Sequence, residues 1–382
     1  MNLRYKSGRH LKFNMHGTFG YGTLNWFRVL YKNKFKVELS AVPKVLWITI
    51  SILSTNVFRI YEDFRFNRAV RKVKIKEPIF ILGYPRSGTT FLHYLMVKDP
   101  QFSYCATYQV LMPNLFLTMG NFLEKFLRKL LPETRLIDNV RMDSALPKEE
   151  EFAMSAISDA SMVNGFYFPK NIMKYFRRYV LFSEDEKYEY EWKKKYLFFL
   201  KKVALKNPDK RLILKSPFNT GRIKEILQLF PDAKFIHIHR NPYEVYYSNE
   251  KLYEVMMPTF SLHKIEEEKM EKFILDSYKL TYSKFFDELP LIPANNITTV
   301  AYEQMLVNPM MVLNKIYDDL NLENFEEARR SIESELVAGK NYKAHIHVMN
   351  PETKAEIYKE WEYFFNKFGY IQKESISHLK AV

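Results

Sequence analysis

Short apolar runs recur along this chain, and a longer segment with apolar residues at helical spacing follows each of the first three. The runs lie at residues 78–82, 211–214, 233–239 and 297–300. Helices are expected from about Gly88, over 223–230, over 245–256 and, near the C-terminus, over 352–368. Short strands that alternate with helices are typical of a parallel sheet covered by helices on both faces. The pattern predicts an α/β fold, in which ligands bind at the carboxyl ends of the strands.

The longest apolar stretch, residues 45–58, precedes this pattern and is shorter than the roughly 20 residues that span a bilayer. Six basic residues follow it: Arg65, Arg68, Arg71, Lys72, Lys74 and Lys76. An apolar helix beside basic residues resembles an interfacial membrane anchor. A buried helix with solvated charges at its end is the interpretation that we favour from the sequence.

No linker rich in proline, glycine or serine divides the chain, and no internal repeat is visible. We therefore predict two parts. Residues 1–76 form a helical, partly apolar and basic extension, and residues 77–382 form one α/β domain with helical insertions and a C-terminal helix.

Composition narrows the classes of partner. The net charge of +14 fits an anionic cofactor or substrate, a membrane surface or a nucleic acid, but no nucleic-acid-binding motif is present. A single cysteine, Cys105, excludes an internal disulfide and fits a reducing compartment. The basic N-terminal segment leads into no apolar core, so we expect no signal peptide. These features predict a cytoplasmic protein, with peripheral membrane contact as the open alternative.

Residues 83–90 carry the most specific local motif. They follow the first apolar run and precede a helix, an arrangement that points backbone N–H groups at a phosphate. Gly83 and Gly88 have the spacing of a P-loop, but Thr89 stands where a P-loop NTPase has its lysine, and the positive charge is at Arg86. The loop predicts binding of a nucleotide with a single phosphate beside the transferred group, without hydrolysis of a triphosphate.

The predicted strands end in side chains suited to anions. Arg86, Lys215, Arg240 and Tyr302 follow the four apolar runs, so three cations and a phenol should meet at one edge of the sheet. A P-loop kinase or ATPase needs an aspartate after an apolar strand to help hold Mg²⁺. No predicted strand ends in aspartate. The pattern argues against a magnesium-dependent enzyme, and we expect no metal or redox cofactor.

Two separated motifs together resemble those of the sulfotransferases that use 3′-phosphoadenosine 5′-phosphosulfate (PAPS). Tyr84-Pro85-Arg86-Ser87-Gly88-Thr89-Thr90 is similar to that family's 5′-phosphosulfate loop, and Arg240-Asn241-Pro242-x5-Ser248 to its 3′-phosphate motif. The segments Leu214-Lys215-Ser216-Pro217 and 230–236 resemble a largely bacterial branch. The resemblance covers about residues 78–308. It implies a P-loop-like parallel sheet and transfer of a sulfuryl group from PAPS to a hydroxyl, with release of 3′,5′-ADP.

The resemblance also implies a set of cofactor-binding residues from both motifs: Arg86, Ser87, Gly88, Thr89, Thr90, Phe91, Arg240, Ser248 and Tyr302. Backbone amides of residues 87–90 and the threonine hydroxyls would bind the 5′-phosphate. Arg240 and Ser248 would hold the 3′-phosphate. For Phe91 and Tyr302, contact with the nucleotide and packing in the core are equally open.

Two cations are implied to act on the transferred group. Arg86 would meet the charge that develops on the bridging oxygen, as an electrostatic clamp rather than an acid. Lys215 would contact the sulfuryl group, since relatives carry a lysine in this segment. Familiar cytosolic members have a histidine shortly after that lysine as the general base, and this chain has none there.

The base candidates are Glu149 and Glu150, in Pro147-Lys148-Glu149-Glu150-Glu151, which resembles an acidic motif of the bacterial branch. Their side chains would point about 100° apart on a helix, so one could enter the site while the other does not. An acidic first turn that only complements the helix dipole is the alternative interpretation.

Histidine pairs and C-terminal lysines are weaker candidates. His237 and His239 share one face of a strand and lack a third ligand at suitable spacing, so we interpret them as structural. His345 and His347 are interpreted in the same way, with acceptor contact as the alternative. Lys340 and Lys343 are candidates for a basic loop that returns to the 3′-phosphate.

The acceptor is predicted from composition. Aromatic residues make up 16% of the chain, with clusters at 166–168 and 196–199 beside the apolar stretch 45–58. The aromatic clusters and the apolar stretch, taken together, predict an apolar pocket for a hydrophobic alcohol, such as a sterol or lipid. A carbohydrate is the second candidate, since aromatics stack on sugars. A nucleotide-binding, membrane-peripheral protein without turnover and a degenerate P-loop kinase are the alternatives of other classes.

Overall fold

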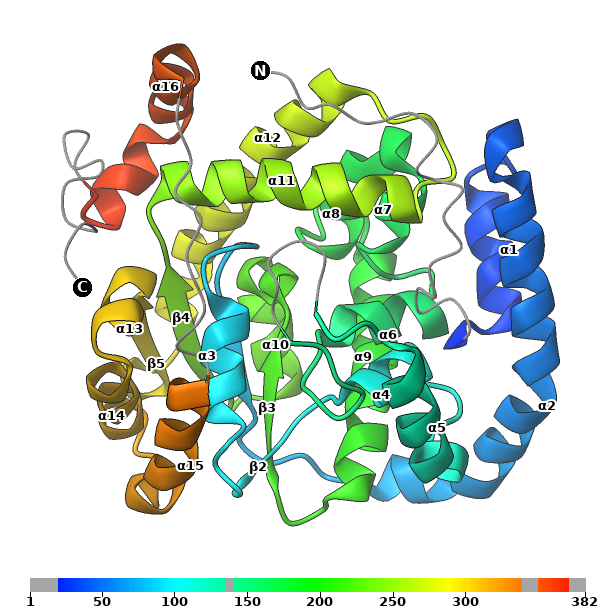
Figure 1. The fold of residues 1–382 in the computed structure, drawn as a ribbon, viewed down its shortest axis with the longest axis horizontal. Helices are drawn as coiled ribbons and strands as arrows, with labels where there is room; N and C mark the ends of the chain where they lie inside the picture. The colour runs from blue at the N-terminus through cyan, green and yellow to red at the C-terminus, as the bar shows by residue number, and fades with distance from the viewer. Residues whose placement is uncertain (1–19, 135–140, 339–349, 371–382) are drawn as a thin grey trace.

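The computed structural model describes residues 20–134, 141–338 and 350–370, and within them the chain forms a five-stranded sheet (Figure 1). All strand pairs are parallel, in the order β2-β3-β1-β4-β5. The strands are β1 (Ile79–Leu82), β2 (Phe102–Ser103), β3 (Arg211–Lys215), β4 (Lys234–His239) and β5 (Ile297–Ala301). The α/β prediction is confirmed. Lys340, Lys343, His345 and His347 lie outside the described residues.

Helices surround the sheet. Before and around β2 they are α1 (Thr23–Lys32), α2 (Val42–Lys72), α3 (Thr89–Met96), α4 (Thr107–Leu111) and α5 (Phe116–Leu130). Between β2 and β4 they are α6 (Glu150–Ile157), α7 (Asn164–Tyr167), α8 (Ile172–Tyr179), α9 (Glu186–Lys206), η5 (Pro217–Gly221) and α10 (Ile223–Leu229). The remainder are α11 (Pro242–Phe260), α12 (Glu267–Glu288), α13 (Tyr302–Val307), α14 (Pro309–Asp319), α15 (Phe325–Ala338) and α16 (Pro351–Lys367). Short one-turn segments lie at η3 (Leu39–Ala41), η4 (Pro169–Asn171), η6 (Leu289–Leu291) and η7 (Ala294–Asn296).

Strand β1 is apolar and buried at every position because both faces of the sheet are covered there. Ile79 and Ile81 of β1 belong to a buried cluster with side chains of α3, α14 and α15. Phe80 and Leu82 point to the opposite face and join a larger cluster that includes α9, α10 and α12. Alternate residues of a strand face opposite sides, so the four-residue run divides evenly between two cores. Strand β2 was not predicted from the sequence, because two residues are too few to show the alternation of side chains that marks a strand.

Parallel register brings the ends of the strands to one edge. Ile81 of β1 pairs with Lys215 of β3, and Leu82 pairs with His237 of β4. His239 of β4 in turn pairs with Ala301 of β5. The residues that follow these strands therefore lie along one edge, as the α/β pattern predicts.

The interpretation of residues 45–58 as a buried helix is wrong for most of the segment. The segment is part of α2, a helix of 31 residues that buries only Ile48, Ser51, Ile52, Glu62 and Val70. Its outward side chains remain exposed because α2 lies at the edge of the molecule, where no other described element covers them (Figure 1). Among the described residues, the helical stretch Leu39–Lys72 is long and apolar enough to cross a membrane by length and composition, a test that core helices also pass.

A buried ion pair fixes the start of α6. Arg222 Nη1 lies 2.6 Å from Glu151 Oε2, and neither side chain is exposed to solvent. Arg222 also donates from Nε to the carbonyl of Tyr179 at 2.7 Å and covers the ring of Trp192. Glu151 directly follows the two candidate bases, so this pair sets the orientation of the acidic segment.

Replacing Arg222 with methionine should therefore lower the free energy of unfolding by about 3–5 kcal/mol, because it leaves the Glu151 carboxylate buried without its cation. Urea unfolding followed by circular dichroism measures the change. Arg329→Met is the matched control, since Arg329 pairs with Glu326 and Glu333 on the surface and should shift the unfolding midpoint little. Equal losses in the two variants would contradict the importance of the buried pair.

Candidate active site

The loop between β1 and α3 has an unusual backbone path. Gly83, Arg86 and Gly88 have φ angles of 150°, 75° and 98°. A Cβ on Gly88 would lie 2.2 Å from the ring of Tyr302, so a side chain has no room there. Within this loop, Arg86 is a non-glycine residue with φ in the left-handed region. This backbone conformation is uncommon for a residue with a side chain and often occurs at binding sites.

Ser87 stabilises this path. Its N–H and its hydroxyl both donate to the carbonyl of Tyr84, at 3.1 and 2.8 Å. The N–H of Gly83 donates to Thr220 Oγ1 at 2.8 Å, which ties the loop to η5. Ser87 is fully buried, so its side chain shapes the loop in this structure.

The N-terminus of α3 points out of this loop. The helix begins at Thr89, and no side chain caps it. The first N–H groups of an uncapped helix lack partners within the helix and carry partial positive charge, which favours an anion. Thr90 lies in the first turn and is half-buried, so both its N–H and its hydroxyl are near this end.

A second group of polar side chains meets beside the loop. Arg86 Nε donates to Ser248 Oγ of α11 at 2.8 Å. Arg240, after β4, donates from Nη1 to the carbonyl of Arg86 at 3.3 Å, and its guanidinium lies 4.8 Å from the centre of the Tyr302 ring. Arg86, Arg240 and Tyr302 thus gather at the sheet edge, as the sequence predicts, and Ser248 faces them from α11.

Acidic residues hold this cluster in place. Arg240 Nη2 lies 3.1 Å from Glu244 Oε2, one turn further along α11. Burial raises the pKa of Glu244, and the nearby Arg240 opposes that rise. The N–H of Asn241 donates to Glu303 at 3.0 Å, and Tyr370 also donates to Glu303 at 2.7 Å. These contacts orient Arg240 toward the loop rather than toward solvent.

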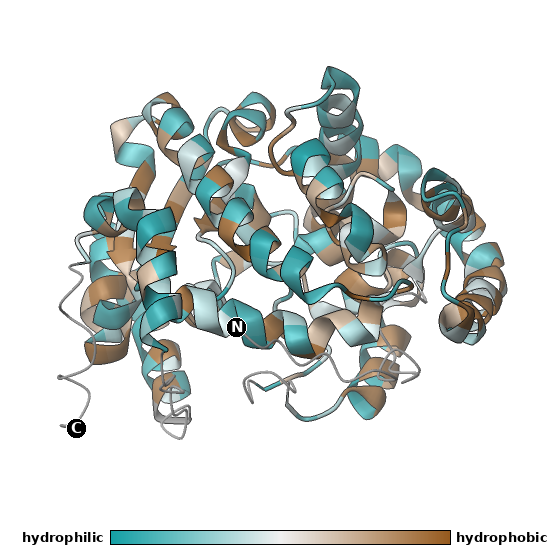
Figure 2. Cartoon of the chain, turned by 90° about the horizontal axis from the view of Figure 1, so that it is seen from above, coloured by the Kyte–Doolittle hydropathy of each residue, from teal (hydrophilic) through white to brown (hydrophobic). Residues whose placement is uncertain are grey.

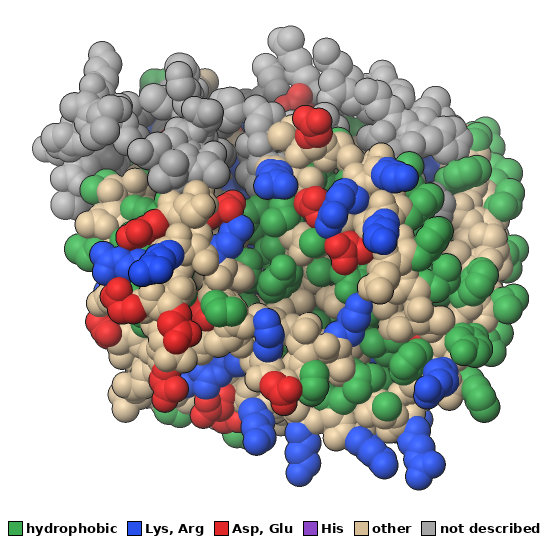
Figure 3. All heavy atoms as spheres, turned by 60° about the horizontal axis from the view of Figure 1, so that its bottom comes forward, with side chains coloured by type: hydrophobic (Ala, Val, Ile, Leu, Met, Phe, Trp, Pro, Cys, Tyr) green, Lys and Arg blue, Asp and Glu red, His purple; other side chains and the backbone are tan. Residues whose placement is uncertain are grey.

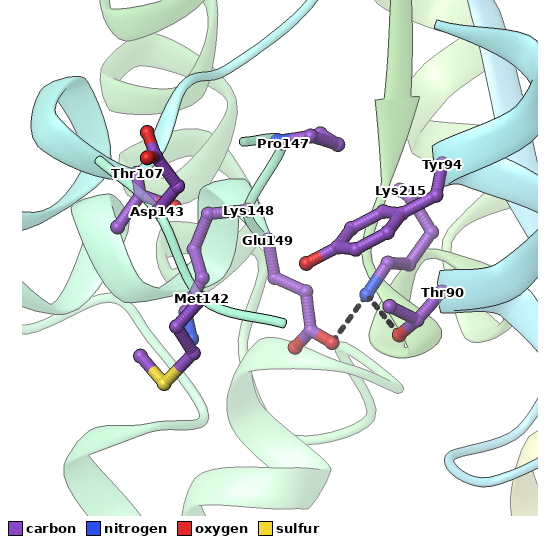
Figure 4. Close-up of a pocket in the computed structure, with 9 residues that line it drawn as sticks. All are labelled: Thr90, Tyr94, Thr107, Met142, Asp143, Pro147, Lys148, Glu149 and Lys215. Carbon is purple, nitrogen blue, oxygen red and sulfur yellow. Dashed lines mark hydrogen bonds and ion pairs between the residues drawn. The ribbon is translucent and has the colours of Figure 1, made fainter. Parts of the chain in front are cut away.

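Lys215 and Glu149 meet beside Thr90, in the first turn of α3 (Figure 4). Lys215 Nζ lies 2.5 Å from Glu149 Oε1 and 3.3 Å from Thr90 Oγ1. The Lys215 side chain is 4% exposed, whereas that of Glu149 is 22% exposed. Glu149 precedes α6 and lines a pocket, so its carboxylate can be reached by a small molecule.

Glu150 points in a different direction from Glu149. Its Oε1 accepts hydrogen bonds from Tyr196 and from Asn219, both at 2.7 Å, and the side chain is fully buried. Burial raises the pKa of Glu150, which favours the neutral acid. Of these two carboxylates, only that of Glu149 lines the pocket.

The pocket also contains residues that the sequence analysis missed. Tyr94, Thr107, Met142, Asp143 and Lys148 line it together with Thr90, Pro147, Glu149 and Lys215 (Figure 4). Tyr94 follows Thr90 by one helical turn, so helical spacing could have identified it. Met142 and Asp143 lie outside helices and strands, and no local pattern marks them.

Several aromatic residues pack in the core instead of lining this pocket. Phe166, Tyr167 and Phe168 are buried, as are Tyr196 and Phe199, so the two aromatic clusters do not supply the apolar pocket that we expected from them. Phe91 is half-buried and packs beside the cluster around β1 and α3.

The side chains of the two β4 histidines, His237 and His239, pack against aromatic rings on one face of the sheet. The His239 ring stacks on Phe368 at 4.8 Å, and the His237 ring lies 4.4 Å from that of Phe285. Burial lowers the pKa of both. Their surroundings are aromatic, as expected for structural residues. In the described ranges, no group of three or more His, Cys, Asp or Glu side chains is arranged to hold a metal ion.

Comparisons with known proteins find similarity over most of the chain. A family model described as "Sulfotransferase family" matches residues 78–327. The chain is 28% identical over 347 residues to omega-hydroxy-beta-dihydromenaquinone-9 sulfotransferase Stf3 of Mycobacterium bovis and of Mycobacterium tuberculosis, covering 90% of this chain and 89% of the relative.

Two solved structures share the fold. Sulfotransferase STF9 from Mycobacterium avium aligns with a TM-score of 0.62 at 17% identity, over 91% of this chain and 97% of that chain. Sulfotransferase STF1 from Mycobacterium tuberculosis aligns with a TM-score of 0.57 at 15% identity, over 90% and 93%.

Proposed function

Because this chain belongs to the sulfotransferase family, we propose that it transfers a sulfuryl group from PAPS to the hydroxyl of a lipid-like alcohol. The observation that carries the proposal is the position of the α3 N-terminus. Both groups of side chains adjoin it: Lys215 of the Lys215–Glu149 pair donates to Thr90, and the Tyr302 ring, over which Arg240 lies, is close to Gly88. The cluster of Arg86, Arg240 and Ser248 suits a donor with two separate phosphates, and the Lys215–Glu149 pair suits chemistry on a hydroxyl.

The donor would be held without a metal ion. Arg240 and Ser248 would bind the 3′-phosphate, because a guanidinium and a hydroxyl both donate to its oxygens. The N–H groups of residues 88–90 would bind the 5′-phosphate at the start of α3. Arg86 adjoins the 3′-phosphate residues, since its side chain contacts Ser248 and its carbonyl accepts from Arg240, and it belongs to the same loop as Gly88. It would meet the negative charge that develops on the bridging oxygen.

The transfer needs one base and a preorganised field. The acceptor oxygen forms a bond to sulfur as the bond from sulfur to the phosphate oxygen breaks, and the hydroxyl proton goes to the Glu149 carboxylate. Lys215 would stabilise the sulfuryl oxygens during this step. Lys215 Nζ lies 2.5 Å from Glu149 Oε1, so this ion pair restricts the positions of both side chains.

The acceptor class rests on the relatives. Stf3 is named for a hydroxylated menaquinone, and the similarity extends over most of both chains. Met142 and Tyr94 give the pocket apolar surface, while Asp143 and Thr107 add polar groups. A long alcohol that places only its hydroxyl end in the pocket is compatible with this lining.

The test is transfer of label from PAPS by the purified full-length protein. A hydroxylated polyprenyl quinone, a sterol, a phenol and an oligosaccharide are offered in parallel, and sulfated products are identified by mass spectrometry. We expect product with the lipid alcohols. Product with the oligosaccharide alone would overturn the acceptor class. Binding of 3′,5′-ADP without product from any acceptor would instead support a nucleotide-binding protein that lacks turnover.

A further inference from the structure

The outward surface of α1 and α2 is apolar over an unusual length. Fifteen large hydrophobic side chains in this region are 38–89% exposed. They define what we name the α1–α2 face: Leu24, Phe27, Tyr31, Phe35, Leu39, Val42, Leu46, Trp47, Ile50, Leu53, Val57, Phe58, Ile60, Tyr61 and Phe64. Figure 2 shows hydrophobic residues around these helices at the right-hand edge, and Figure 3 shows hydrophobic side chains gathered along the same edge. A soluble helix normally turns polar side chains outward, so this surface needs a partner.

The charged residues within this stretch are turned away from the face. From Val42 to Phe64, Lys44, Arg59 and Asp63 are half-buried and Glu62 is buried. Lys44 donates to the carbonyl of Thr259, and Arg59 donates to Asn56. No charged side chain in the described stretch from Val42 to Phe64 is classed as exposed, so exposed charge does not interrupt the α2 part of the face. The α1 part is mixed, because Arg28, Lys32, Lys34, Lys36 and Glu38 are exposed there.

A basic rim borders the C-terminal end of the face. It consists of six residues, all exposed: Arg65, Arg68, Arg71, Lys72, Lys74 and Lys76. Lys and Arg side chains also project from the lower edge of the molecule in Figure 3, beside the hydrophobic edge. Apolar side chains next to a cationic cluster match the two layers of an anionic bilayer surface, acyl chains and phosphates. We propose that the α1–α2 face and its basic rim dock this protein on a membrane that contains anionic lipid.

The helix lies on the membrane and does not cross it. The buried side of α2 carries Glu62, which pairs with Lys202 of α9 at 2.6 Å, and both side chains are at most 5% exposed. Lys202 also donates to the carbonyl of Pro113 at 2.6 Å. A spanning helix would have lipid on every side and would have to break this buried pair, which is strongly unfavourable.

A second copy of the chain fits the face less well. An isologous dimer would press the α1–α2 face against itself. That contact would cover the apolar side chains but would offer no cluster of carboxylates to the basic rim. Lipid phosphates satisfy both parts of the surface at once, so we choose the membrane as the partner.

The face also lies close to the site. The side chain of Asn25 in α1 donates to the carbonyl of Ser155 in α6 at 2.8 Å, and the N–H of Gly22 donates to the carbonyl of Ala156 at 2.9 Å. Glu149 directly precedes α6. Helix α6 therefore connects the pocket, at Glu149, with the inner side of α1, whose outer side belongs to the face.

Trp47 gives a direct test. Of the four tryptophans in the chain, Trp26, Trp192 and Trp361 are fully buried, whereas Trp47 is 49% exposed on the face. Vesicles of phosphatidylcholine and phosphatidylglycerol with brominated acyl chains should quench Trp47 and shift its emission to shorter wavelength. Trp47→Phe should lose this response and still bind the vesicles, because phenylalanine keeps the face apolar. Absence of quenching in the wild-type protein would overturn the proposal.

Vesicle flotation measures the affinity. The triple variant Leu46→Asp, Ile50→Asp, Val57→Asp should bind at least about tenfold more weakly. Val307→Asp, Met311→Asp is the matched control, because these residues are also exposed but belong to α13 and α14 on the other side of the molecule (Figure 1). Wild-type affinity should fall when phosphatidylglycerol is omitted or salt is raised. Equal affinity with and without anionic lipid would overturn the role assigned to the rim.

Two further readouts separate the possible causes of failure. Binding of 3′,5′-ADP and the melting temperature show that the triple variant is folded. The molecular mass in solution is measured as the protein concentration rises. If the wild-type protein dimerises, the triple variant stays monomeric and the wild type does not bind vesicles, the face is a dimer interface and the proposal is overturned. None of these measurements depends on sulfuryl transfer, so docking and catalysis are tested separately.

Discussion

Replacing Glu149 with glutamine should lower kcat by about 10²- to 10⁴-fold, the usual contribution of a positioned general base. The amide cannot accept the acceptor's proton, yet it has the same shape and can still accept from Lys215, 2.5 Å from the carboxylate in this structure. Binding of 3′,5′-ADP should remain close to the wild-type value, because Glu149 is not part of the Arg86–Ser248 cluster. Single-turnover rates with PAPS, together with calorimetry for 3′,5′-ADP, separate the two effects.

Glu150→Gln is the matched control for this prediction. Burial raises the pKa of Glu150 and favours its neutral form, which glutamine imitates. The glutamine oxygen can still accept the hydrogen bonds that Tyr196 and Asn219 now donate to Oε1. Activity should therefore stay near the wild-type value. If Glu150→Gln lost as much activity as Glu149→Gln, or if Glu149→Gln kept full activity, the assignment of the base would be wrong.

Local patterns predict from the sequence alone which side chains gather at the edge of the sheet. The first three apolar runs form strands whose apolar residues divide between two buried clusters, as Ile81 and Leu82 do. Parallel register then places the residues after the strands at one edge, without any knowledge of long-range contacts. Ser248 faces the loop because it lies two helical turns after Arg240. These relations depend on the geometry of single elements, which sequence spacing captures.

The choice between Glu149 and Glu150 depends on contacts that no local pattern contains. Both residues lie at the same helix start, and only their directions differ. Asn219, 69 residues further along the chain, holds Glu150 in the core, and Arg222, 71 residues from Glu151, fixes the turn that follows. The direction of each carboxylate therefore follows from tertiary packing.

The burial of helix α2 also could not be predicted from a local pattern. Hydropathy marks residues 45–58 as apolar but does not say which surface covers them. Ile48 and Ile52 pack inward, whereas Ile50 and Leu53 in the same stretch are exposed. Burial of a helix depends on what lies beside it, and the favoured interpretation assumed a neighbour that the described structure does not supply.

Replacing Arg240 with alanine should weaken binding of 3′,5′-ADP by about 10- to 100-fold, as expected for lost hydrogen bonds between charged groups. Adenosine 5′-monophosphate is the matched ligand, because it lacks the 3′-phosphate and should bind both proteins alike. The variant should thus lose the preference for the bisphosphate while it keeps the site for the 5′-phosphate. Isothermal titration with the two nucleotides measures this difference.

Arg211→Ala controls for the loss of a positive charge, since Arg211 lies at the amino end of β3 and pairs with Glu77. It should leave both affinities unchanged. Removal of Arg240 also takes away the contact to the carbonyl of Arg86, so a melting curve must show that the loop is still folded. If Arg240→Ala still bound 3′,5′-ADP more tightly than adenosine 5′-monophosphate by the wild-type factor, Arg240 would not be the residue that binds the 3′-phosphate.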